Sequence, residues 1–283
     1  MTLTQHLSCE SVVMQLSFII LSWNSENYLR DCFESILSKC NAEDVAFEVI
    51  VIDNGSQDRS AEIIKDYSQA HPGSFMLIQL TANRGTTFPR NLGLKQAKGE
   101  YVCIIDSDTE LGEGRLAEIL DRLDKHQSIG LIAPRLLLPG GIVQNSVKHF
   151  PTMLNKLLKI PRILLGIKTR NADFYADFPF SEERQVESAI SACWFFRKAL
   201  LDQVGLLDER IFYAPEDVEF SLRVWKAGYA VLYYPGFTVL HHTQQITHKK
   251  PLSKTSLSHF WGLLYYYRKH GGWLTRPKFA PAD

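Results

Sequence analysis

The sequence has few cysteines, and none of them belongs to a Cys-x-x-Cys pair. The five cysteines are scattered: Cys9, Cys32, Cys40, Cys103 and Cys193. An odd total without close spacing fits reduced thiols better than a disulfide framework. We therefore expect a cytoplasmic location.

Long apolar runs and a secretion signal are also absent. No apolar stretch approaches the roughly 20 residues that a membrane-spanning helix needs. The first fifteen residues include Glu10 and lack a basic start followed by an apolar block, so they do not resemble a signal peptide. With 283 residues the chain is long enough for one large domain, which we favour, or for two small ones.

The chain has no excess of either charge and none of the common glycine-rich nucleotide motifs. Lys+Arg and Asp+Glu both total 31, so no overall field attracts a polyanion. We therefore expect no nucleic-acid partner. No Gly-x-Gly-x-x-Gly follows the first predicted strand, and no Gly-x-x-x-x-Gly-Lys-Ser/Thr occurs. These absences argue against dinucleotide-binding and P-loop proteins.

Strand and helix patterns alternate through the first hundred residues. Short apolar runs predict buried strands at 16–21, 47–52, 75–80 and 101–105. Apolar residues at helical spacing follow each of the first three. This alternation implies a mostly parallel sheet with helices on both faces, so the expected fold class is α/β.

The stretch from Lys98 to Leu111 carries the clearest chemical signal. Its apolar strand stops at Asp106 and Asp108, and ligands bind at the carboxyl ends of strands in open α/β sheets. Two carboxylates there suit a hard divalent cation that keeps substrate phosphates in its shell. The same residues also suit a simple turn. Trp23, after the first strand, could stack on a nucleobase or be a partly buried corner aromatic.

The second half has a looser pattern. It predicts a helix at 116–123, strands at 129–133, 188–196 and 229–234, a hairpin within 137–149, and a short strand ending at His241-His242. Pro215 precedes a helix whose first turn contains Glu216, Asp217 and Glu219. Acidic residues at a helix start complement its dipole, which is a sufficient role for any one of them.

Two later segments mix apolar and basic residues. Residues 156–170 alternate leucine and isoleucine with lysine and arginine, and 257–270 form a predicted helix rich in aromatic residues. Residues 156–170 could lie on an anionic membrane surface, line an acceptor groove or form a solvated loop with a packed apolar side, and the helix at 257–270 could be interfacial or simply docked on the domain. A peripheral contact with the inner face of the cell membrane is one expectation.

Six motifs in order carry a family resemblance. They are Ile-Leu-Ser-Trp-Asn, Val-Ile-Asp-Asn-Gly-Ser-Gln-Asp, Asn-Arg-Gly with Arg-Asn-Leu-Gly, Ile-Asp-Ser-Asp, Pro-Glu-Asp-Val-Glu-Phe-Ser-Leu-Arg, and the histidine six residues after Pro235. Through them, residues 16–270 resemble a family 2 inverting glycosyltransferase of the GT-A fold, with rhamnosyltransferase-like members the most similar.

The resemblance implies a nucleotide-sugar site in the first half of the chain. Asp53 would accept a hydrogen bond from the nucleobase ring, and Trp23 and Arg84 would flank the base. Asp106 would contact the ribose, and Arg90 belongs to the same site. Related chains usually have small residues where this one has Thr-Thr-Phe-Pro at 86–89, so the loop beside the donor sugar is expected to differ.

The resemblance also implies a metal site and a general base. Asp108 and His241 would hold a divalent cation, Mg²⁺ or Mn²⁺, on the diphosphate. Asp217 would be the base, and Glu216 would orient the acceptor beside it. The chemistry agrees, because a Lewis acid assists a diphosphate leaving group and a positioned carboxylate takes a hydroxyl proton. A single displacement inverts the sugar.

The expected function is transfer of a sugar from a UDP- or dTDP-sugar, with dTDP-rhamnose among the candidates, to a glycan or lipid-linked acceptor. This places the chain in cell-surface polysaccharide or glycolipid biosynthesis. A sugar-nucleotide nucleotidyltransferase is a weaker alternative, because it needs a glycine-rich loop and residues 22–26 lack glycine. A non-catalytic nucleotide- or carbohydrate-binding module would not need Glu216, Asp217 and His241.

The expected organisation has three parts. Residues 1–15 form an N-terminal lead, 16–245 the GT-A domain, and 246–283 a C-terminal helical extension. The GT-A domain would divide into a nucleotide-sugar-binding half at 16–110 and an acceptor half at 111–245.

Overall fold

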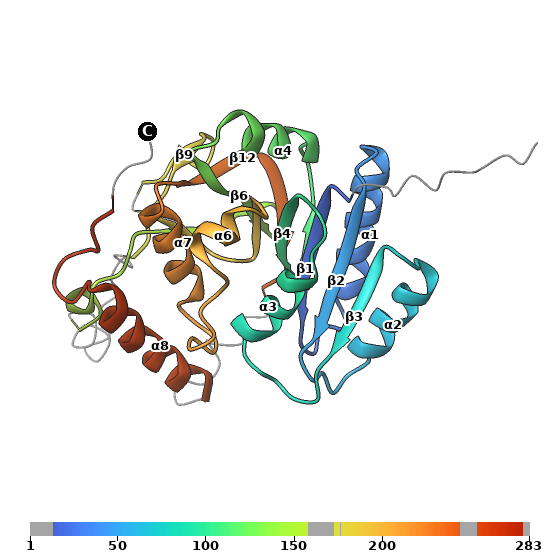
Figure 1. Cartoon of the computed structure of the whole chain (residues 1–283), viewed down its shortest axis with the longest axis horizontal. Coiled ribbons are helices and arrows are strands. Elements are labelled where there is room, and N and C mark those ends of the chain that lie inside the picture. The colour runs from blue at the N-terminus through green and yellow to red at the C-terminus, as the bar shows by residue number, and fades with distance from the viewer. Residues whose placement is uncertain (1–13, 158–172, 176, 244–253, 280–283) are drawn as a thin grey trace, which may run out of the picture.

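Parallel strands form the first half of a central sheet in the computed structural model, which describes residues 14–157, 173–175, 177–243 and 254–279 (Figure 1). These strands are β1 (Leu16–Ser22), β2 (Phe47–Asp53), β3 (Phe75–Gln79) and β4 (Tyr101–Asp106). They lie in the order β3-β2-β1-β4, and each neighbouring pair is parallel. Their nearly continuous apolar sequences suit strands that are covered on both faces.

Helices cover the two faces of this half. They are α1 (Leu29–Ala42), α2 (Ser60–Ala70) and α3 (Thr87–Gln96). The buried apolar residues of α1 and α2 belong to one core, whereas Leu94 of α3 belongs to a second core, and α3 lies in front of the sheet in Figure 1. A Cβ on Gly93 of α3 would lie 2.7 Å from Cγ2 of Ile19 and 2.8 Å from Cδ1 of Ile52. The absent side chain therefore lets α3 pack directly on β1 and β2.

The second half of the sheet is mixed. Its main strands are β5 (Thr109–Leu111), β6 (Ile129–Leu138), β11 (Cys193–Arg197) and β12 (Ala230–His241). β11 lies between β4 and β6 and is antiparallel to both. The last residues of β12 pair antiparallel with β5, which sets His241 opposite Thr109. This register brings the end of β12 to the turn that follows β4.

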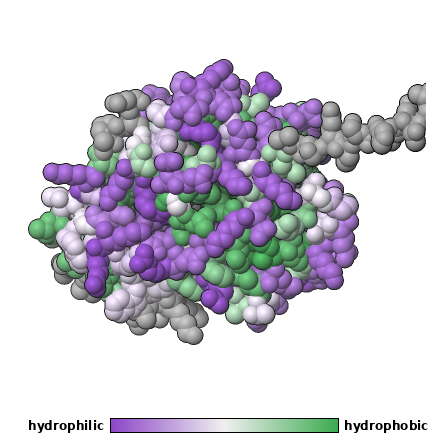
Figure 2. Space-filling view, viewed as in Figure 1, coloured by the Kyte–Doolittle hydropathy of each residue, from purple (hydrophilic) through white to green (hydrophobic). Residues whose placement is uncertain are grey.

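Shorter elements complete the fold. They are α4 (Leu116–Lys125), β7 (Ile142–Val143), β8 (Val147–Lys148), β9 (Arg184–Gln185), β10 (Ser188–Ala189), α6 (Leu200–Val204), α7 (Glu216–Lys226) and α8 (Lys254–His270). β7 pairs with β6, β9 pairs with β12, and β8 and β10 form a separate two-stranded sheet. α8 lies at the lower left of the molecule in Figure 1. On the same face, apolar surface gathers near the centre and hydrophilic surface surrounds it (Figure 2).

The predicted α/β class is confirmed, but two strand predictions are wrong in detail. The strand expected at 188–196 is two strands, because β10 leaves the main sheet to pair with β8 before β11 enters it. The strand at 229–234 and the short strand after it are one strand, β12. Its pairing with β6 shifts between Tyr234 and Thr238, where Pro235 has no N–H to donate to the ladder.

Some predicted segments lie outside the described residues. These are 1–13 of the N-terminal lead, 158–170 of the basic-apolar segment, and 246–253 and 280–283 of the C-terminal extension. The division into two halves and a C-terminal extension stays a prediction. No helix in the described part of the chain is long and apolar enough to cross a membrane.

Charged contacts attach α8 to the rest of the fold. Lys269 Nζ lies 2.6 Å from Oδ2 of Asp208 and 2.7 Å from Oε1 of Glu219. Arg223 and His270 also contact the Glu219 carboxylate, at 2.9 Å and 3.0 Å. Burial alone would raise the pKa of Glu219, but these partners outweigh burial and lower the pKa to about 2.

Neutralising Glu219 is expected to destabilise the protein at neutral pH. Because the pKa falls from an ordinary 4.5 to about 2 on folding, the stabilisation is complete above the ordinary value and is lost as the pH falls toward 2. Each pKa unit corresponds to about 1.4 kcal/mol, so Glu219→Gln is expected to cost on the order of 3 kcal/mol at pH 7. Urea unfolding at pH 7 and pH 3 measures this.

The matched control is Glu182→Gln. The Glu182 side chain is 58 % exposed and pairs with Arg184 at 2.9 Å; exposed pairs of this kind contribute at most about 1 kcal/mol. The difference between the Glu219 variant and wild type should shrink at pH 3. A difference that stays constant with pH would contradict the linkage to Glu219.

Candidate active site

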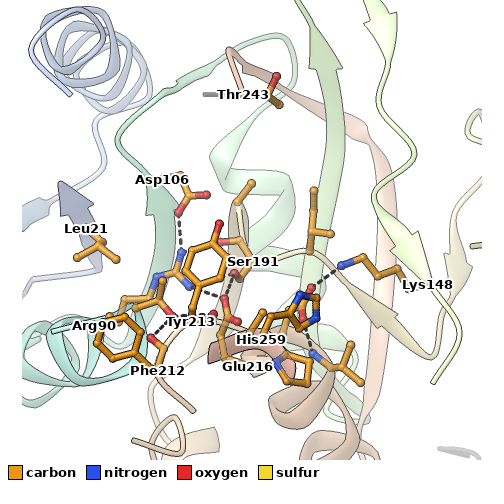
Figure 3. Close-up of a pocket in the computed structure, with 18 of the residues that line it drawn as sticks. Leu21, Arg90, Asp106, Lys148, Ser191, Phe212, Tyr213, Glu216, Thr243 and His259 are labelled. Atoms are coloured by element: carbon orange, nitrogen blue, oxygen red, sulfur yellow. Dashed lines mark hydrogen bonds and ion pairs between the residues drawn. The ribbon is translucent and has the colours of Figure 1, made fainter. Parts of the chain in front are cut away.

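A cavity of about 950 Å³ opens at the carboxyl ends of β1 and β4 (Figure 3). Its walls come from both halves of the chain. The lining residues that bear on function are Trp23, Arg90, Asp106, Asp108, Lys148, Ser191, Tyr213, Glu216, Asp217, His241 and His259. Most of the residues predicted from the sequence therefore share one cavity.

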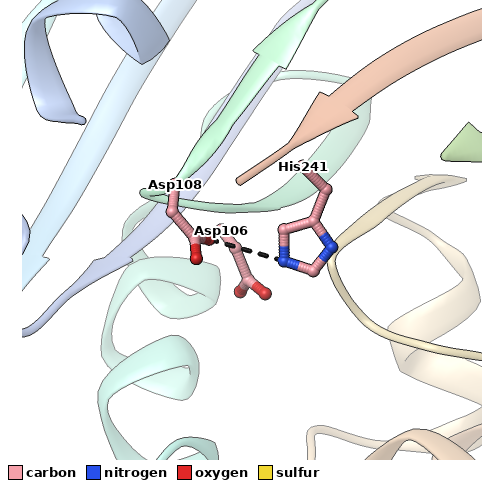
Figure 4. Close-up of side chains that lie close together, drawn as sticks. All are labelled: Asp106, Asp108 and His241. Atoms are coloured by element: carbon pink, nitrogen blue, oxygen red, sulfur yellow. Dashed lines mark ion pairs between the residues drawn. The ribbon is translucent and has the colours of Figure 1, made fainter. Parts of the chain in front are cut away.

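Asp106, Asp108 and His241 form a cluster in the lining of the cavity (Figure 4). One ligand atom from each lies within 4.8 Å of the others, and His241 Nε2 is 3.6 Å from Asp108 Oδ1. The cluster exists because β4 ends at Asp106 and the β5–β12 pairing returns His241 to the same turn. Asp106, which the resemblance assigned to the ribose, is thus also within reach of a cation.

The donor set fits a divalent metal. Carboxylate oxygens are the ligands that Mg²⁺ and Mn²⁺ prefer, and a neutral imidazole nitrogen is a common metal ligand in proteins. His241 Nδ1 lies 2.8 Å from Oε1 of Gln144. When Nδ1 donates to this oxygen, the lone pair of Nε2 is left for a cation. His242 faces elsewhere, with Nε2 2.6 Å from Glu110 and its ring 5.3 Å from that of Tyr28.

Arg90 connects this cluster to the start of α7. Its guanidinium donates to Asp106 Oδ1 at 2.5 Å, to Ser191 Oγ at 3.0 Å and to Glu216 Oε1 at 3.4 Å. The Ser191 hydroxyl donates to the same Glu216 oxygen at 3.1 Å. Arg90 is 2 % exposed. It therefore neutralises both acidic groups from beneath the cavity floor.

Glu216 and Asp217 are adjacent, buried and held in different ways. Asp217 Oδ2 accepts from Lys148 Nζ at 2.8 Å, and Oδ1 accepts from the backbone N–H of Val218 at 2.8 Å. Burial alone would raise the pKa of Asp217, but the charge of Lys148 and its hydrogen bond outweigh burial and lower the pKa. Burial and the neighbouring Asp217 charge raise the pKa of Glu216 to about 7. Asp217 therefore stays ionised at neutral pH, and Glu216 is the member of the pair that takes up a proton.

Two predicted nucleotide-binding residues do not line this cavity. Asp53 is 1 % exposed; its Oδ1 accepts from the Ser56 N–H at 3.3 Å, and its Oδ2 has no hydrogen-bond partner among the described residues. Arg84 is exposed, and its guanidinium lies 4.9 Å from the centre of the Phe88 ring. Trp23, Arg90 and Asp106 thus line one cavity, and Asp53 and Arg84 do not.

The segment at 85–87 joins the two sides of the cavity. Thr86 donates through its N–H to Phe212 O at 2.7 Å and through its hydroxyl to Tyr213 O at 3.0 Å. Thr87 Oγ1 donates to Ile211 O at 2.6 Å. Gly85 has φ +82, and a Cβ there would lie 2.0 Å from Phe212 O. The unusual threonines therefore bind the 211–213 loop.

Sequence reasoning missed three residues in the cavity wall. Tyr213 follows no motif, although it lies two residues before Pro215; burial raises its pKa to about 12, so its hydroxyl can donate at neutral pH. Lys148 lies in the two-residue strand β8, and His259 lies on α8. Burial, followed by the charge of Lys156, lowers the pKa of His259. No spacing pattern in the sequence marks Lys148 or His259.

The sequence profile of glycosyl transferase family 2 matches residues 17–205. The chain therefore belongs to this family. It is 26 % identical over 250 residues to the N-acetylglucosaminyl-diphospho-decaprenol L-rhamnosyltransferase of Mycobacterium tuberculosis, covering 81 % of this chain and 77 % of that protein. The predicted rhamnosyltransferase-like membership of family 2 is thus confirmed.

Solved structures show the same fold. GalNAc-T7 with UDP, GalNAc and Mn²⁺ aligns with a TM-score of 0.66 at 16 % identity, over 93 % of this chain and 52 % of that chain. Staphylococcus aureus TarS 1–349 with UDP-GlcNAc aligns with a TM-score of 0.55 at 22 % identity, over 85 % of this chain and 62 % of that one. These neighbours are glycosyltransferases, and the predicted GT-A fold is confirmed. This chain spans less than two thirds of either structure.

Proposed function

We propose that this chain transfers a sugar from a nucleotide diphosphate-sugar to an acceptor hydroxyl with inversion. The observation that supports this most is that two acidic groups line one cavity and that Arg90 contacts a member of each. Asp106, Asp108 and His241 form one group after β4, and Glu216 with Asp217 forms the other at the start of α7. One group suits a diphosphate with its cation, and the other suits a hydroxyl that must lose a proton. A single displacement needs both.

Asp217 is the proposed general base. Its lowered pKa keeps it ionised, so it can accept the proton of the acceptor hydroxyl. Lys148 orients the carboxylate through Oδ2. Glu216, held by Arg90 and Ser191, would orient the acceptor beside the base.

Asp106, Asp108 and His241 are the proposed holders of a divalent cation. When bound, Mg²⁺ or Mn²⁺ supplies Lewis-acid stabilisation of the diphosphate leaving group. The structure of GalNAc-T7 was determined with Mn²⁺, which supports a cation in a related fold. Arg90 would keep Asp106 in place through its bond to Oδ1.

The proposed donor is a UDP- or dTDP-sugar, with dTDP-rhamnose a candidate because a relative is named as a rhamnosyltransferase. Trp23 would stack on the base. Asp53 Oδ2, buried and without a partner among the described residues, would accept a ring N–H, with Arg84 nearby. The proposed acceptor is a glycan or lipid-linked hydroxyl, and the proposed location is cytoplasmic, at the inner face of the cell membrane.

A screen of nucleotide sugars tests this proposal. With Mn²⁺ present, the purified chain should slowly hydrolyse one UDP- or dTDP-sugar and release the nucleoside diphosphate. Binding without release from any donor, with Mn²⁺ or Mg²⁺, would favour a non-catalytic module. Formation of a sugar nucleotide from a nucleoside triphosphate and a sugar phosphate would instead identify a nucleotidyltransferase.

A further inference from the structure

Large apolar side chains are exposed around the C-terminal helix. Their exposed fractions run from 41 % for Leu154 to 72 % for Leu274. The full set is Leu154, Leu157, Phe260, Trp261, Trp273 and Leu274, which we call the C-terminal surface. Monomeric proteins seldom expose so many large apolar side chains on neighbouring segments without a function.

The segments that carry the C-terminal surface are in contact. The N–H groups of Met153 and Leu154 donate to the carbonyls of Gly272 and Trp273, both at 3.0 Å. The Trp273 ring lies 5.7 Å from that of Tyr267 on α8. Residues 153–157, α8 and 271–279 therefore form one side of the molecule, at the left in Figure 1.

Charged residues are unevenly distributed along the chain. Helix α8 and residues 271–279, which carry most of the C-terminal surface, belong to a basic stretch of the sequence. Residues 220–282 contain nine lysines and arginines and no aspartate or glutamate, although the whole chain has 31 of each sign. Arg268 and Lys278 are exposed, and Arg276 is 43 % exposed while it contacts Glu187. Acidic residues from other segments do contact this side, but the side chains of Asp208, Glu219 and Glu187 are only 8 %, 1 % and 16 % exposed. The exposed tryptophan, leucine and basic side chains match the composition of surfaces that lie in an anionic membrane interface.

The same elements reach the cavity from their inner side. Lys156, next to Leu157, lines the cavity, as do His259 and Leu263 of α8. At Gly262 the helix lies close to the loop before α7, because a Cβ there would be 2.1 Å from Ala214 O. Residues 153–157 and α8 therefore carry the exposed apolar side chains on their outer side and line the proposed acceptor site on their inner side.

We propose that the C-terminal surface docks on an anionic lipid bilayer. The tryptophan and leucine side chains enter the headgroup region, and the basic residues contact the anionic lipids. Docking would bring the cavity to a membrane-borne acceptor, and only this role of the docking rests on the proposed function. The docking itself is independent of turnover, so it can be measured without a donor.

Vesicle flotation tests the docking. The full chain is mixed with vesicles of phosphatidylcholine, alone or with phosphatidylglycerol, at low and high salt. We expect binding to the anionic vesicles and release by salt, because the electrostatic part is screened within about 8 Å at physiological ionic strength. Absence of binding to anionic vesicles at low salt would overturn the proposal.

Paired variants test the surface itself. Trp273→Ser with Leu274→Ser should weaken vesicle binding at least about tenfold, because two large apolar side chains no longer leave water on docking. The control is Ile142→Ser with Val143→Ser on β7, where the side chains are 64 % and 39 % exposed; binding should not change. Equal loss in both pairs, or none in the first, would contradict the assignment.

Two further measurements distinguish membrane docking from an effect on the cavity and from dimerisation. Hydrolysis of the donor in solution should be the same in wild type and the Trp273/Leu274 variant, because neither residue lines the cavity. If wild type is a dimer by light scattering and the variant is a monomer, with vesicle binding unchanged, the surface is a contact between two copies and the membrane proposal is wrong.

Discussion

Asp217→Asn is expected to lower the rate of sugar transfer by at least about a hundredfold, which is the usual contribution of a positioned general base. Asparagine keeps the size of the side chain and removes the charge that accepts the proton. Asp217 is not part of the Asp106, Asp108 and His241 cluster, so donor binding should survive. Steady-state transfer rates and nucleotide titrations measure the two effects separately.

Glu216→Gln is the matched comparison. Glu216 contacts Arg90 and Ser191 rather than Lys148, so its replacement should disturb orientation more than proton transfer. The pH dependence gives a second test. The charge of Lys148 lowers the pKa of Asp217. Lys148→Met should therefore raise this pKa and move the acidic limb of the pH–rate profile to higher pH. Near-normal transfer by Asp217→Asn together with an inactive Glu216→Gln would make Glu216 the base.

Chelation is expected to weaken nucleotide binding strongly, and Asp108→Ala should remove this dependence on metal. Asp108 supplies an oxygen to the only cluster of at least three potential metal-binding residues found among the described residues. Without it, two ligands remain, which is few for a hard cation. Titration of UDP or dTDP with and without EDTA measures the effect. Equal affinity of wild type under both conditions would rule out a metal-linked diphosphate site.

The adjacent histidines provide the control for this experiment. His241 lies in the cluster, whereas His242 contacts Glu110 at 2.6 Å. Loss of even an outer partner of a metal ligand often costs tenfold or more in affinity. His241→Ala should therefore reduce metal-dependent binding at least about tenfold more than His242→Ala does. The opposite ranking would place the other histidine at the metal.

The strands in the first half of the fold can be predicted from the sequence because the patterns that indicate them are local. Each buried parallel strand is a short apolar run, and each is followed by a polar turn. β11 is different. Its insertion between β4 and β6 depends on which distant strands meet, and an apolar run such as Cys193–Arg197 carries no information about its partner or direction.

The site is predictable only where motifs identify it. Asp108, His241 and Asp217 stand in motifs, and the structure gathers all three around one cavity. Lys148 and His259 come from a two-residue strand and a terminal helix, and their positions depend on tertiary packing. The contact of Arg90 with both Asp106 and Glu216 is likewise a property of the assembled fold.

The hydrogen bonds of Thr86 and Thr87 have a consequence for protein engineering. These side chains bind carbonyls of residues 211–213, and Gly85 leaves no room for a Cβ against Phe212. A chimera that exchanges only residues 84–90 for those of another family member would break these bonds and misplace Tyr213. The segments 84–90 and 211–213 therefore form one structural module, and a redesign of either segment has to graft both.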